Sequence, residues 1–324
     1  MSLQFIFGNS GSGKSHYLYQ RIVKESMEHP EKNYIVLVPE QFTMQTQKDL
    51  CLAHPRGGIM NIDVLSFGRL AHRVFEEVGK DQRAVLDDEG KNLVIRKIAA
   101  NYEDELTVLK GNLKKQGYIS EVKSVISEFT QYGVDFERLD GFMDGLSQES
   151  YLYYKLKDIR KVYEGFEDYL REKYITKEEM LDVLSDAVPD SSVLKGSVVA
   201  MDGFTGFTPV QDRLLGELLK VCEKVIVTVE MDGREDPFVY RHPYQLFSMS
   251  KQMVTSLVKI AGENGTEVEE PVCMYEQPPR RFCGNPAMAF LESEIFRYSG
   301  RKYESPQDSI TLHEARNPRM EAQY

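Results

Sequence analysis

The sequence predicts an α/β protein in which a parallel sheet is interrupted by an all-helical subdomain. A phosphate-binding motif lies at residues 8–15, between a short apolar strand and a helix, and it predicts a sheet of the P-loop NTPase type. Further apolar runs, at 34–38, 197–201 and 224–229, have the composition of strands that are buried on both faces of a parallel sheet. From about residue 80 to 195 the strand signal gives way to helical periodicity, which predicts the insertion.

The phosphate-binding motif comes first along the chain. Residues 8–15 read G-N-S-G-S-G-K-S, a complete G-x-x-x-x-G-K-[ST] loop. Glycines let backbone N–H groups surround a phosphate, and the start of the next helix adds partial positive charge. Lys14 would reach the β- and γ-phosphates, and the Ser15 hydroxyl would ligate Mg²⁺. The sequence therefore predicts binding of ATP with Mg²⁺. The expected nucleotide-binding residues are Gly8, Asn9, Ser10, Gly11, Ser12, Gly13, Lys14 and Ser15.

The next elements follow in α/β order. The apolar run 34–38 reads as the second strand, and 62–65 reads as the third. The helix after the third strand has one apolar face and stops at Gly79. Residues 1–79 are therefore predicted to form the first part of the sheet domain, and residues 80–195 to form the helical insertion.

The sheet is expected to resume after the insertion. The strand at 197–201 is followed by a Thr-Pro pair at 208–209, an N-cap and first-turn proline that predict a helix. The run 224–229 is a further buried strand, and one more strand is expected to begin at 310–312. Residues 318–324 read as a helix that has just begun, so the sequence is expected to be a fragment of a longer protein.

Asp202 directly follows the strand at 197–201 and is the candidate for a second Mg²⁺ contact. A P-loop ATPase holds the metal with an acidic residue that ends a neighbouring strand. The alternative is an Asp that only shapes a strand-to-helix turn. The separation between Lys14 and Asp202 is longer than in small nucleoside kinases, and the helical insertion would account for it.

The composition limits the classes of partner. A net charge of −11 and a pI near 5.2 argue against a free-standing, high-affinity nucleic-acid binder. A local patch, or a complex whose partner supplies positive potential, remains compatible with DNA binding. No apolar run approaches the ~18 residues of a membrane span and no signal peptide is recognisable, so a cytoplasmic protein is expected. The four cysteines form no C-x-x-C pair, so no zinc or iron–sulfur site is expected in this sequence.

The order of these features resembles the superfamily 1 helicases of the UvrD/Rep type and, within them, the AddB subunits of AddAB helicase–nucleases. The resemblance extends through nearly the whole chain. It implies a RecA-like domain split by a 1B-like helical subdomain. Residues 196–324 would be the second part of the RecA-like domain, truncated at the entrance to a second motor domain. Besides the P-loop, the matching segments are V-L-V-P-E-Q-F-T at 36–43, V-L-S-F-G-R-L-A at 64–71, G-Y-I-S-E-V-K-S-V-I-S-E-F at 117–129, D-G-F-T-G-F-T-P-V-Q at 202–211 and E-A-R-N-P-R-M-E at 314–321.

The same resemblance implies a set of DNA contacts after the second and third strands. The expected residues are Gln41, Thr43, Ser66, Phe67 and Arg69. Short polar groups and one cation would contact DNA phosphates, and Phe67 would stack on a base. Two alternatives stay open, namely ordinary loop and capping chemistry for the polar residues and a core position for Phe67.

The sequence departs from an active helicase at the residues that perform hydrolysis. Active relatives carry a Glu after the Asp, and Gly203 stands at that place here. The Gln and Asp that sense the γ-phosphate and support the site correspond to Thr205 and Gly206. The arginines that neutralise the transferring phosphoryl group are expected from a second domain. No catalytic residue is therefore assigned, and nucleotide binding with poor hydrolysis is expected.

The resemblance implies a nucleotide- and DNA-binding part of a helicase/exonuclease subunit that acts in double-strand break repair by homologous recombination. Such a subunit forms a heterodimer with an AddA-like helicase/nuclease, acts on single-stranded and duplex DNA, and scans the single strand for the hotspot Chi. A nuclease domain and an iron–sulfur cluster would lie beyond residue 324. Two other classes stay open: an active P-loop NTPase such as a small-molecule kinase, and a structural scaffold with a relic P-loop.

Overall fold

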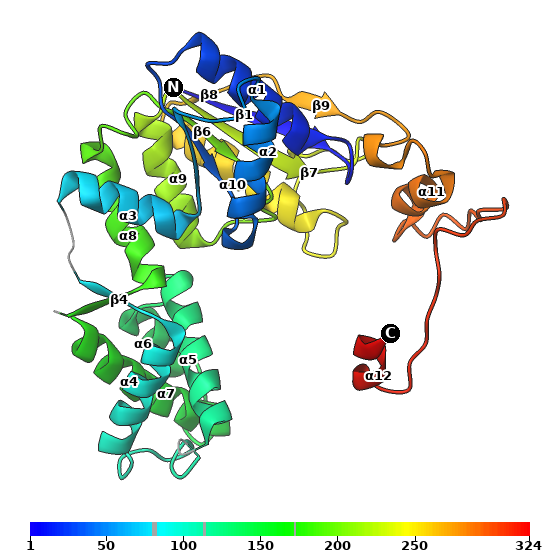
Figure 1. Cartoon of the computed structure of the whole chain (residues 1–324). Helices are drawn as coiled ribbons and strands as arrows, with labels where there is room; N and C mark the ends of the chain where they lie inside the picture. The colour runs from blue at the N-terminus through cyan, green and yellow to red at the C-terminus, as the bar shows by residue number, and fades with distance from the viewer. Residues whose placement is uncertain (80–82, 113–114, 172) are drawn as a thin grey trace.

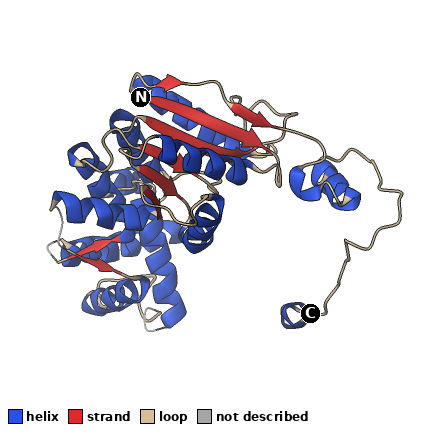
Figure 2. Cartoon of the chain, turned by 45° about the horizontal axis from the view of Figure 1, so that its top comes forward, coloured by secondary structure: helices blue, strands red, loops and turns tan. Residues whose placement is uncertain are grey.

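The computed structural model describes residues 1–79, 83–112, 115–171 and 173–324. A parallel sheet carries helices on both faces, and a helical subdomain lies beside this sheet domain (Figure 1). Near the C-terminus a long arm leaves the sheet domain and ends in a short helix away from the rest of the molecule (Figure 2). The α/β class and the parallel sheet predicted from the sequence are confirmed.

The order of the strands explains why distant loops meet. Among the described residues the main sheet runs β3-β2-β6-β7-β1-β8, and β9 pairs with the end of β1. All these pairings are parallel. The loops after β1 and β6 therefore leave the same edge, separated only by β7. The bounds are β1 Ser2–Gly8, β2 Tyr34–Leu37, β3 Ile62–Leu65, β6 Val198–Met201, β7 Lys224–Glu230, β8 Glu267–Val268 and β9 Val272–Met274.

The two faces of the sheet bury alternate side chains of the same strands. On one face Phe5 and Phe7 of β1 pack in a core formed with α3, α8, α9 and α10. On the other face Ile6 of β1 packs with residues of α1 and α2. Burial on both faces explains why these strands read as unbroken apolar runs. The helices are α1 Lys14–Glu28, α2 Thr43–Ala53, α3 Phe67–Val78, α8 Lys177–Ala187, α9 Pro209–Val221 and α10 Ser248–Glu263; short 3₁₀ turns lie at Glu40–Phe42 (η1) and Val188–Asp190 (η2).

The helical subdomain has a core of its own. Ile95 of α4, Ile126 of α5 and Phe166 of α7 are buried together in a cluster separate from the two sheet cores. Arg160 of α7 bonds Asp140 of α6, and this contact joins the shortest of the four helices α4–α7 to the longest. The periodic apolar residues of these helices thus form the core of the insertion. Its helices are α4 Asp88–Asn101, α5 Gln116–Gln131, α6 Phe136–Asp144 and α7 Tyr151–Leu170.

The insertion differs from the expectation in two details. Two short strands, β4 (Ala84–Leu86) and β5 (Tyr174–Thr176), pair in parallel at its base, where the sequence indicated only helices. Three-residue strands are too short to show a period of two. Met180 and Leu184 of α8 pack in the core of the sheet domain, although α8 lies within the range 80–195. The division at 79/80 and 195/196 stays a prediction.

The last part of the chain forms few regular elements. After β9 come a 3₁₀ turn, η3 (Arg280–Phe282), and helix α11 (Pro286–Glu294). The helix that the sequence predicts near its end is present as α12 (Pro318–Gln323), capped by Asn317. The strand expected at 310–312 is wrong, because this stretch is irregular and its apolar residue Leu312 is exposed.

Candidate nucleotide site

The phosphate-binding loop has the conformation that its glycines predict. It connects the end of β1 to the start of α1, and Gly11 and Gly13 adopt left-handed backbone angles, with φ of 75° and 98°. Other residues rarely tolerate such angles. The N–H of Ser12 donates to the carbonyl of Asn9 at 3.1 Å and closes the turn.

Lys14 is folded against the loop that it belongs to. Its Nζ donates to the carbonyl oxygens of Gly8 at 2.8 Å and of Asn9 at 2.9 Å. Burial lowers the pKa of Lys14 below its usual value, and the charges of Glu230 and Asp202 oppose this change. The ammonium therefore lies within the loop, held by two main-chain acceptors.

Asp202 is the centre of a buried hydrogen-bond network behind the loop. One carboxylate oxygen accepts from Ser15 Oγ at 3.1 Å and from Thr228 Oγ1 at 2.5 Å, and the other accepts from Tyr19 OH at 2.7 Å. Tyr19 also shares a hydrogen bond with Thr46 of α2. Burial and the charge of Asp202 raise the pKa of Tyr19, so its phenol remains a proton donor. The topology thus brings Ser15 and Asp202 together.

The donor set at Asp202 fits a magnesium ion that also binds nucleotide phosphates. Mg²⁺ usually takes one or two protein ligands and completes its shell with phosphate oxygens and water. Ser15 and Asp202 supply a hydroxyl and a carboxylate 3.1 Å apart. Within the described part of the chain, no group of three or more His, Cys, Asp or Glu residues could hold a metal by itself. The metal assignment of Ser15 and Asp202 stays a prediction.

Sequence reasoning missed Tyr19 and Thr228. Both hydroxyls stand in otherwise apolar patterns, on the inward face of α1 and within the buried strand β7. A buried hydroxyl needs a hydrogen-bond partner, so a hydroxyl in an apolar pattern could have indicated a buried acceptor nearby.

Gly203 also has a left-handed backbone, with φ of 80°. A Cβ at this position would meet Pro39 at 3.6 Å, so space is sufficient and the backbone angle is the obstacle. The position at which the resemblance to active helicases would place a Glu thus has a backbone conformation that favours glycine.

A segment far away in the sequence covers the other side of the loop. We call residues 274–294 the covering segment. The N–H of Arg281 donates to the carbonyl of Gly11 at 3.0 Å. A Cβ on Gly8 would lie 2.7 Å from the Met274 carbonyl oxygen, and one on Gly13 would lie 3.3 Å from Arg280 Cδ. The loop glycines therefore also allow this segment to approach.

The covering segment brings two arginines to the loop. Arg280 and Arg281 are exposed, and neither forms an ion pair with any residue that the structure describes. The charge of Arg281 contributes to the lowered pKa of Lys14. The sequence indicated that arginines near the phosphates would come from a second domain, whereas the structure places two from this chain beside the loop.

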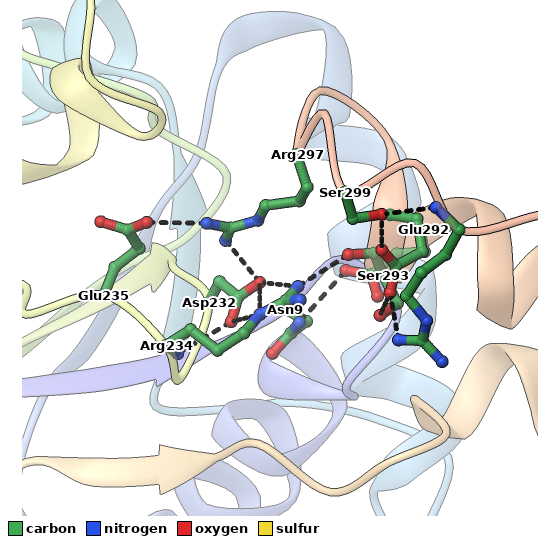
Figure 3. Close-up of polar contacts among 10 residues, drawn as sticks. Asn9, Asp232, Arg234, Glu235, Glu292, Ser293, Arg297 and Ser299 are labelled. Atoms are coloured by element: carbon green, nitrogen blue, oxygen red, sulfur yellow. Dashed lines mark hydrogen bonds and ion pairs between the residues drawn. The ribbon is translucent and has the colours of Figure 1, made fainter.

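A polar network joins the covering segment to the loop (Figure 3). Asn9 Nδ2 donates to Glu292 Oε1 of α11 at 3.2 Å. Beyond α11, Arg297 bonds Asp232 at 2.6 Å and Glu235 at 2.7 Å. Burial raises the pKa of Asp232, but the bonds from Arg234 and Arg297 outweigh it and bring the pKa to about 2. Asp232 is therefore charged at neutral pH, and this part of the network is an ion-pair cluster.

The residues predicted to contact DNA differ in exposure. Gln41 and Arg69 are exposed, and Arg69 forms no ion pair with any described residue. Thr43 and Ser66 are buried. The Thr43 hydroxyl donates to the Glu40 carbonyl in η1, and the Ser66 hydroxyl accepts from the N–H of Arg69 at the start of α3. Phe67 is only 8% exposed, so its core interpretation applies. It packs at 5.3 Å from the Phe204 ring and 6.5 Å from the Phe207 ring.

Sequence reasoning also missed the exposed aromatic residue beside Gln41. Phe42 lies directly after Gln41, at the carboxyl edge of the sheet, and is 49% exposed. Phe42 lies within the segment 36–43 that the sequence analysis singled out. Its exposure could not be predicted, because it depends on the turn at 40–42, which has no periodic sequence pattern.

These features define an α/β domain of the P-loop class with a helical insertion and an in-chain segment that covers the phosphate loop. The family model described as "ADDB, N-terminal" matches residues 5–292. The chain belongs to this family.

Several curated proteins are similar over the whole chain. The B subunit of the ATP-dependent helicase/deoxyribonuclease of Lachnoclostridium phytofermentans is 41% identical, over 100% of this chain and 28% of that protein. The proteins of the same name from Thermoanaerobacter sp. strain X514 and Clostridium kluyveri are 35% and 33% identical, over 98% and 100% of this chain and 27% and 28% of their own lengths. The chain thus spans less than a third of these relatives. Within the described residues, no helix has the length and apolar character to cross a bilayer.

Proposed function

We propose that this chain is the nucleotide- and DNA-binding N-terminal part of an AddB-like helicase/exonuclease subunit. The subunit acts in the cytoplasm, in double-strand break repair by homologous recombination, as a heterodimer with an AddA-like helicase/nuclease. Membership of the family supports this role, as do the names of the relatives, which are B subunits of an ATP-dependent helicase/deoxyribonuclease. The nuclease chemistry and the iron–sulfur cluster belong to sequence beyond residue 324.

The P-loop binds Mg-ATP in this proposal. The observation that carries it is the direct hydrogen bond between Ser15 and Asp202 beside a complete phosphate loop. Lys14 would exchange the Gly8 and Asn9 carbonyls for phosphate oxygens, and Ser15 with Asp202 would hold the metal. Bound Mg²⁺ neutralises charge on the phosphate oxygens.

Hydrolysis is slow in this proposal because three positions that serve hydrolysis in an active helicase lack the required side chains. Gly203 has no side chain, and Thr205 and Gly206 provide no carboxylate to orient a water molecule. Binding alone supplies little acceleration, since phosphoryl transfer depends on positioning and charge stabilisation in the transition state. ATP would then act as a structural ligand rather than as a source of free energy through hydrolysis.

An active P-loop NTPase or small-molecule kinase is the second candidate. The two arginines beside the loop favour it, because cations near the phosphates stabilise the transferring group. A steady-state assay separates the candidates. Slow phosphate release that is equal in the native chain and in Lys14→Ala supports the first, and release above about one per second that Lys14→Ala removes supports the second.

The proposed DNA surface lies at the carboxyl edge of the sheet, beside the nucleotide site. Gln41 and Arg69 are its exposed polar groups, and Phe42 is a candidate for base stacking. This surface would contribute to scanning of the single strand for Chi. Because the net charge is −11, the chain alone should bind DNA weakly, with an affinity that falls steeply with salt. Submicromolar, salt-insensitive binding would contradict this assignment.

A further inference from the structure

Asn9 connects the phosphate loop to the covering segment. Its side chain is 3% exposed and donates to Glu292 of α11 at 3.2 Å (Figure 3). Its main-chain carbonyl accepts from Lys14 Nζ at 2.9 Å. One buried residue therefore contacts both the lysine that a phosphate would attract and the helix on the outer side of the loop.

The polar groups around Asn9 are not fully paired. Among the described residues, Asn9 Oδ1, Ser12 Oγ and Glu292 Oε2 are buried and have no hydrogen-bond partner. Nearly all buried polar atoms in folded proteins are paired, because an unpaired one loses its hydration without compensation. Two of these atoms belong to the side chains that form the Asn9–Glu292 contact, and the third belongs to the same loop as Asn9. The contact therefore has unused bonding capacity, which a second arrangement could satisfy.

The chain just after α11 holds an unfavourable backbone conformation. Phe296 and Tyr298 have φ of 60° and 53°, in the left-handed region that side chains other than glycine rarely adopt. Arg297 lies between them and is fixed by its bonds to Asp232 and Glu235. Both aromatic rings are exposed, Tyr298 by 96%, so their burial does not stabilise this conformation. Strained backbone held by a few contacts is common in segments that switch.

We propose that nucleotide occupancy of the P-loop is transmitted through the Asn9–Glu292 contact to α11 and residues 295–299. The inference rests on the proposed binding of Mg-ATP and adds a response to it. When the triphosphate attracts Lys14 away from the Asn9 carbonyl, the loop carbonyls change partners and the bond to Glu292 changes with them. Helix α11 shifts, and the strained turn around Arg297 rearranges.

This response is possible only if the triphosphate binds the two arrangements with different affinity. The contact at Asn9 supplies that difference in affinity. In the arrangement seen here Lys14 donates to the Asn9 carbonyl, and this bond must break before Lys14 can bind a phosphate, whereas the second arrangement lacks the bond. Asn9 and Glu292 are therefore positioning residues that report the state of the loop.

A single tryptophan can report the change, since the sequence contains none. We expect Tyr298→Trp, an exposed aromatic-for-aromatic change, to alter its fluorescence when Mg-ATP is added. The matched control is Tyr151→Trp, which places the reporter at another exposed tyrosine, on α7 of the helical subdomain. The control should not respond to the nucleotide.

Two variants of Glu292 test the route in the Tyr298→Trp background. Glu292→Ala removes the acceptor for Asn9 Nδ2 and should remove most of the response. Glu292→Gln keeps an acceptor oxygen and should retain the response. Calorimetry on each variant establishes that Mg-ATP is still bound. In the unsubstituted chain, hydrogen exchange at 286–299 should change by roughly 2- to 30-fold on binding.

The outcomes are distinguishable. Calorimetric binding without a change in fluorescence or exchange overturns the transmission and leaves the nucleotide site intact. A full response in Glu292→Ala overturns the route through Glu292. Absence of binding in the native chain overturns the proposed function itself, and the inference with it. If the tryptophan variant does not fold, hydrogen exchange on the native chain decides the question.

Discussion

The phosphate loop is held differently on its two sides. On the sheet side, Ser15, Tyr19 and Thr228 donate to a single buried carboxylate, Asp202. On the covering side, the contacts come from η3 and α11, and most of their polar groups are charged or partly exposed. Breaking the first set would leave buried hydroxyls unpaired, whereas on the covering side water can solvate the exposed cations Arg280 and Arg281. The sheet side should therefore decide whether a nucleotide binds, and the covering side how the protein responds.

The largest effect should come from Lys14, which bonds the loop that both sides support. Lys14→Ala should abolish measurable Mg-ATP binding, a loss of at least about 100-fold, because charge-assisted bonds contribute ~1.5–3 kcal/mol each. Calorimetry measures the loss. The matched control is Lys24→Ala, an exposed lysine of the same helix that should leave affinity unchanged. Equal affinities in the two variants would contradict the assignment of the loop.

Asp202 tests the sheet side directly. Asp202→Asn keeps the size of the side chain but removes its negative charge, so Mg-ATP affinity should fall roughly tenfold while metal-free ATP binds as before. Asp212→Asn is the control, since Asp212 is a partly buried carboxylate of α9 that bonds Ser256 outside the site. A loss that does not depend on magnesium would show that Asp202 acts only through the fold.

Gly203 tests whether the sheet side could be made catalytic by one substitution. Gly203→Glu should not produce a fast ATPase, and the left-handed backbone at φ of 80° should make the variant about 1–2 kcal/mol less stable. Phosphate release and thermal unfolding measure the two expectations. Gly203→Ala is the control, because it carries the same backbone cost without a carboxylate. A rate well above that of the native chain would overturn the interpretation of a degenerate helicase site.

On the sheet side, the loop and Asp202 could be predicted from the sequence, because they are either contiguous or ordered by topology, whereas the hydroxyls of Tyr19 and Thr228 could not. Residues 8–15 form one motif, and Asp202 follows a strand that a parallel sheet must place at the same edge. The covering side could not be predicted, since residues 274–294 reach the loop through packing that leaves no period or motif. The mistaken strand at 310–312 has the same origin. Its apolar pattern is visible, but a strand needs a neighbour, and this stretch lies exposed on the C-terminal arm.

Arg280 and Arg281 test the covering side, where smaller effects are expected. Their side chains are exposed, so replacing either with Ala should weaken Mg-ATP binding by only roughly 2- to 5-fold. The loss should shrink at high salt, because exposed charges are screened. Arg301→Ala is the control, a cation of the arm that pairs with Glu294. A 100-fold loss in either variant would reverse the comparison, since the covering side would then decide binding.

The smallest effect on Mg-ATP affinity is expected where the insertion meets the sheet domain, away from the loop. Two effects raise the pKa of Glu167 to about 7: burial is the larger, and the nearby carboxyl group of Glu179 is the second. The folded chain therefore binds a proton that the unfolded chain loses near pH 4.5. The resulting stability is complete below that ordinary value and is lost as pH rises through about 7. Glu167→Gln should remove this pH dependence, which amounts to about 1–2 kcal/mol between pH 5 and 8 after allowance for solvent at a partly buried site.

Thermal unfolding at the two pH values measures this effect, with Glu164→Gln on the exposed face of the same helix as the control. Because Glu167 and Glu179 join α7 to α8 and neither contacts the phosphate loop, Mg-ATP affinity should be the same in Glu167→Gln and in the native chain. If the substitution changed that affinity, the insertion would communicate with the nucleotide site, and the two sides of the loop could not be considered apart from the helical subdomain.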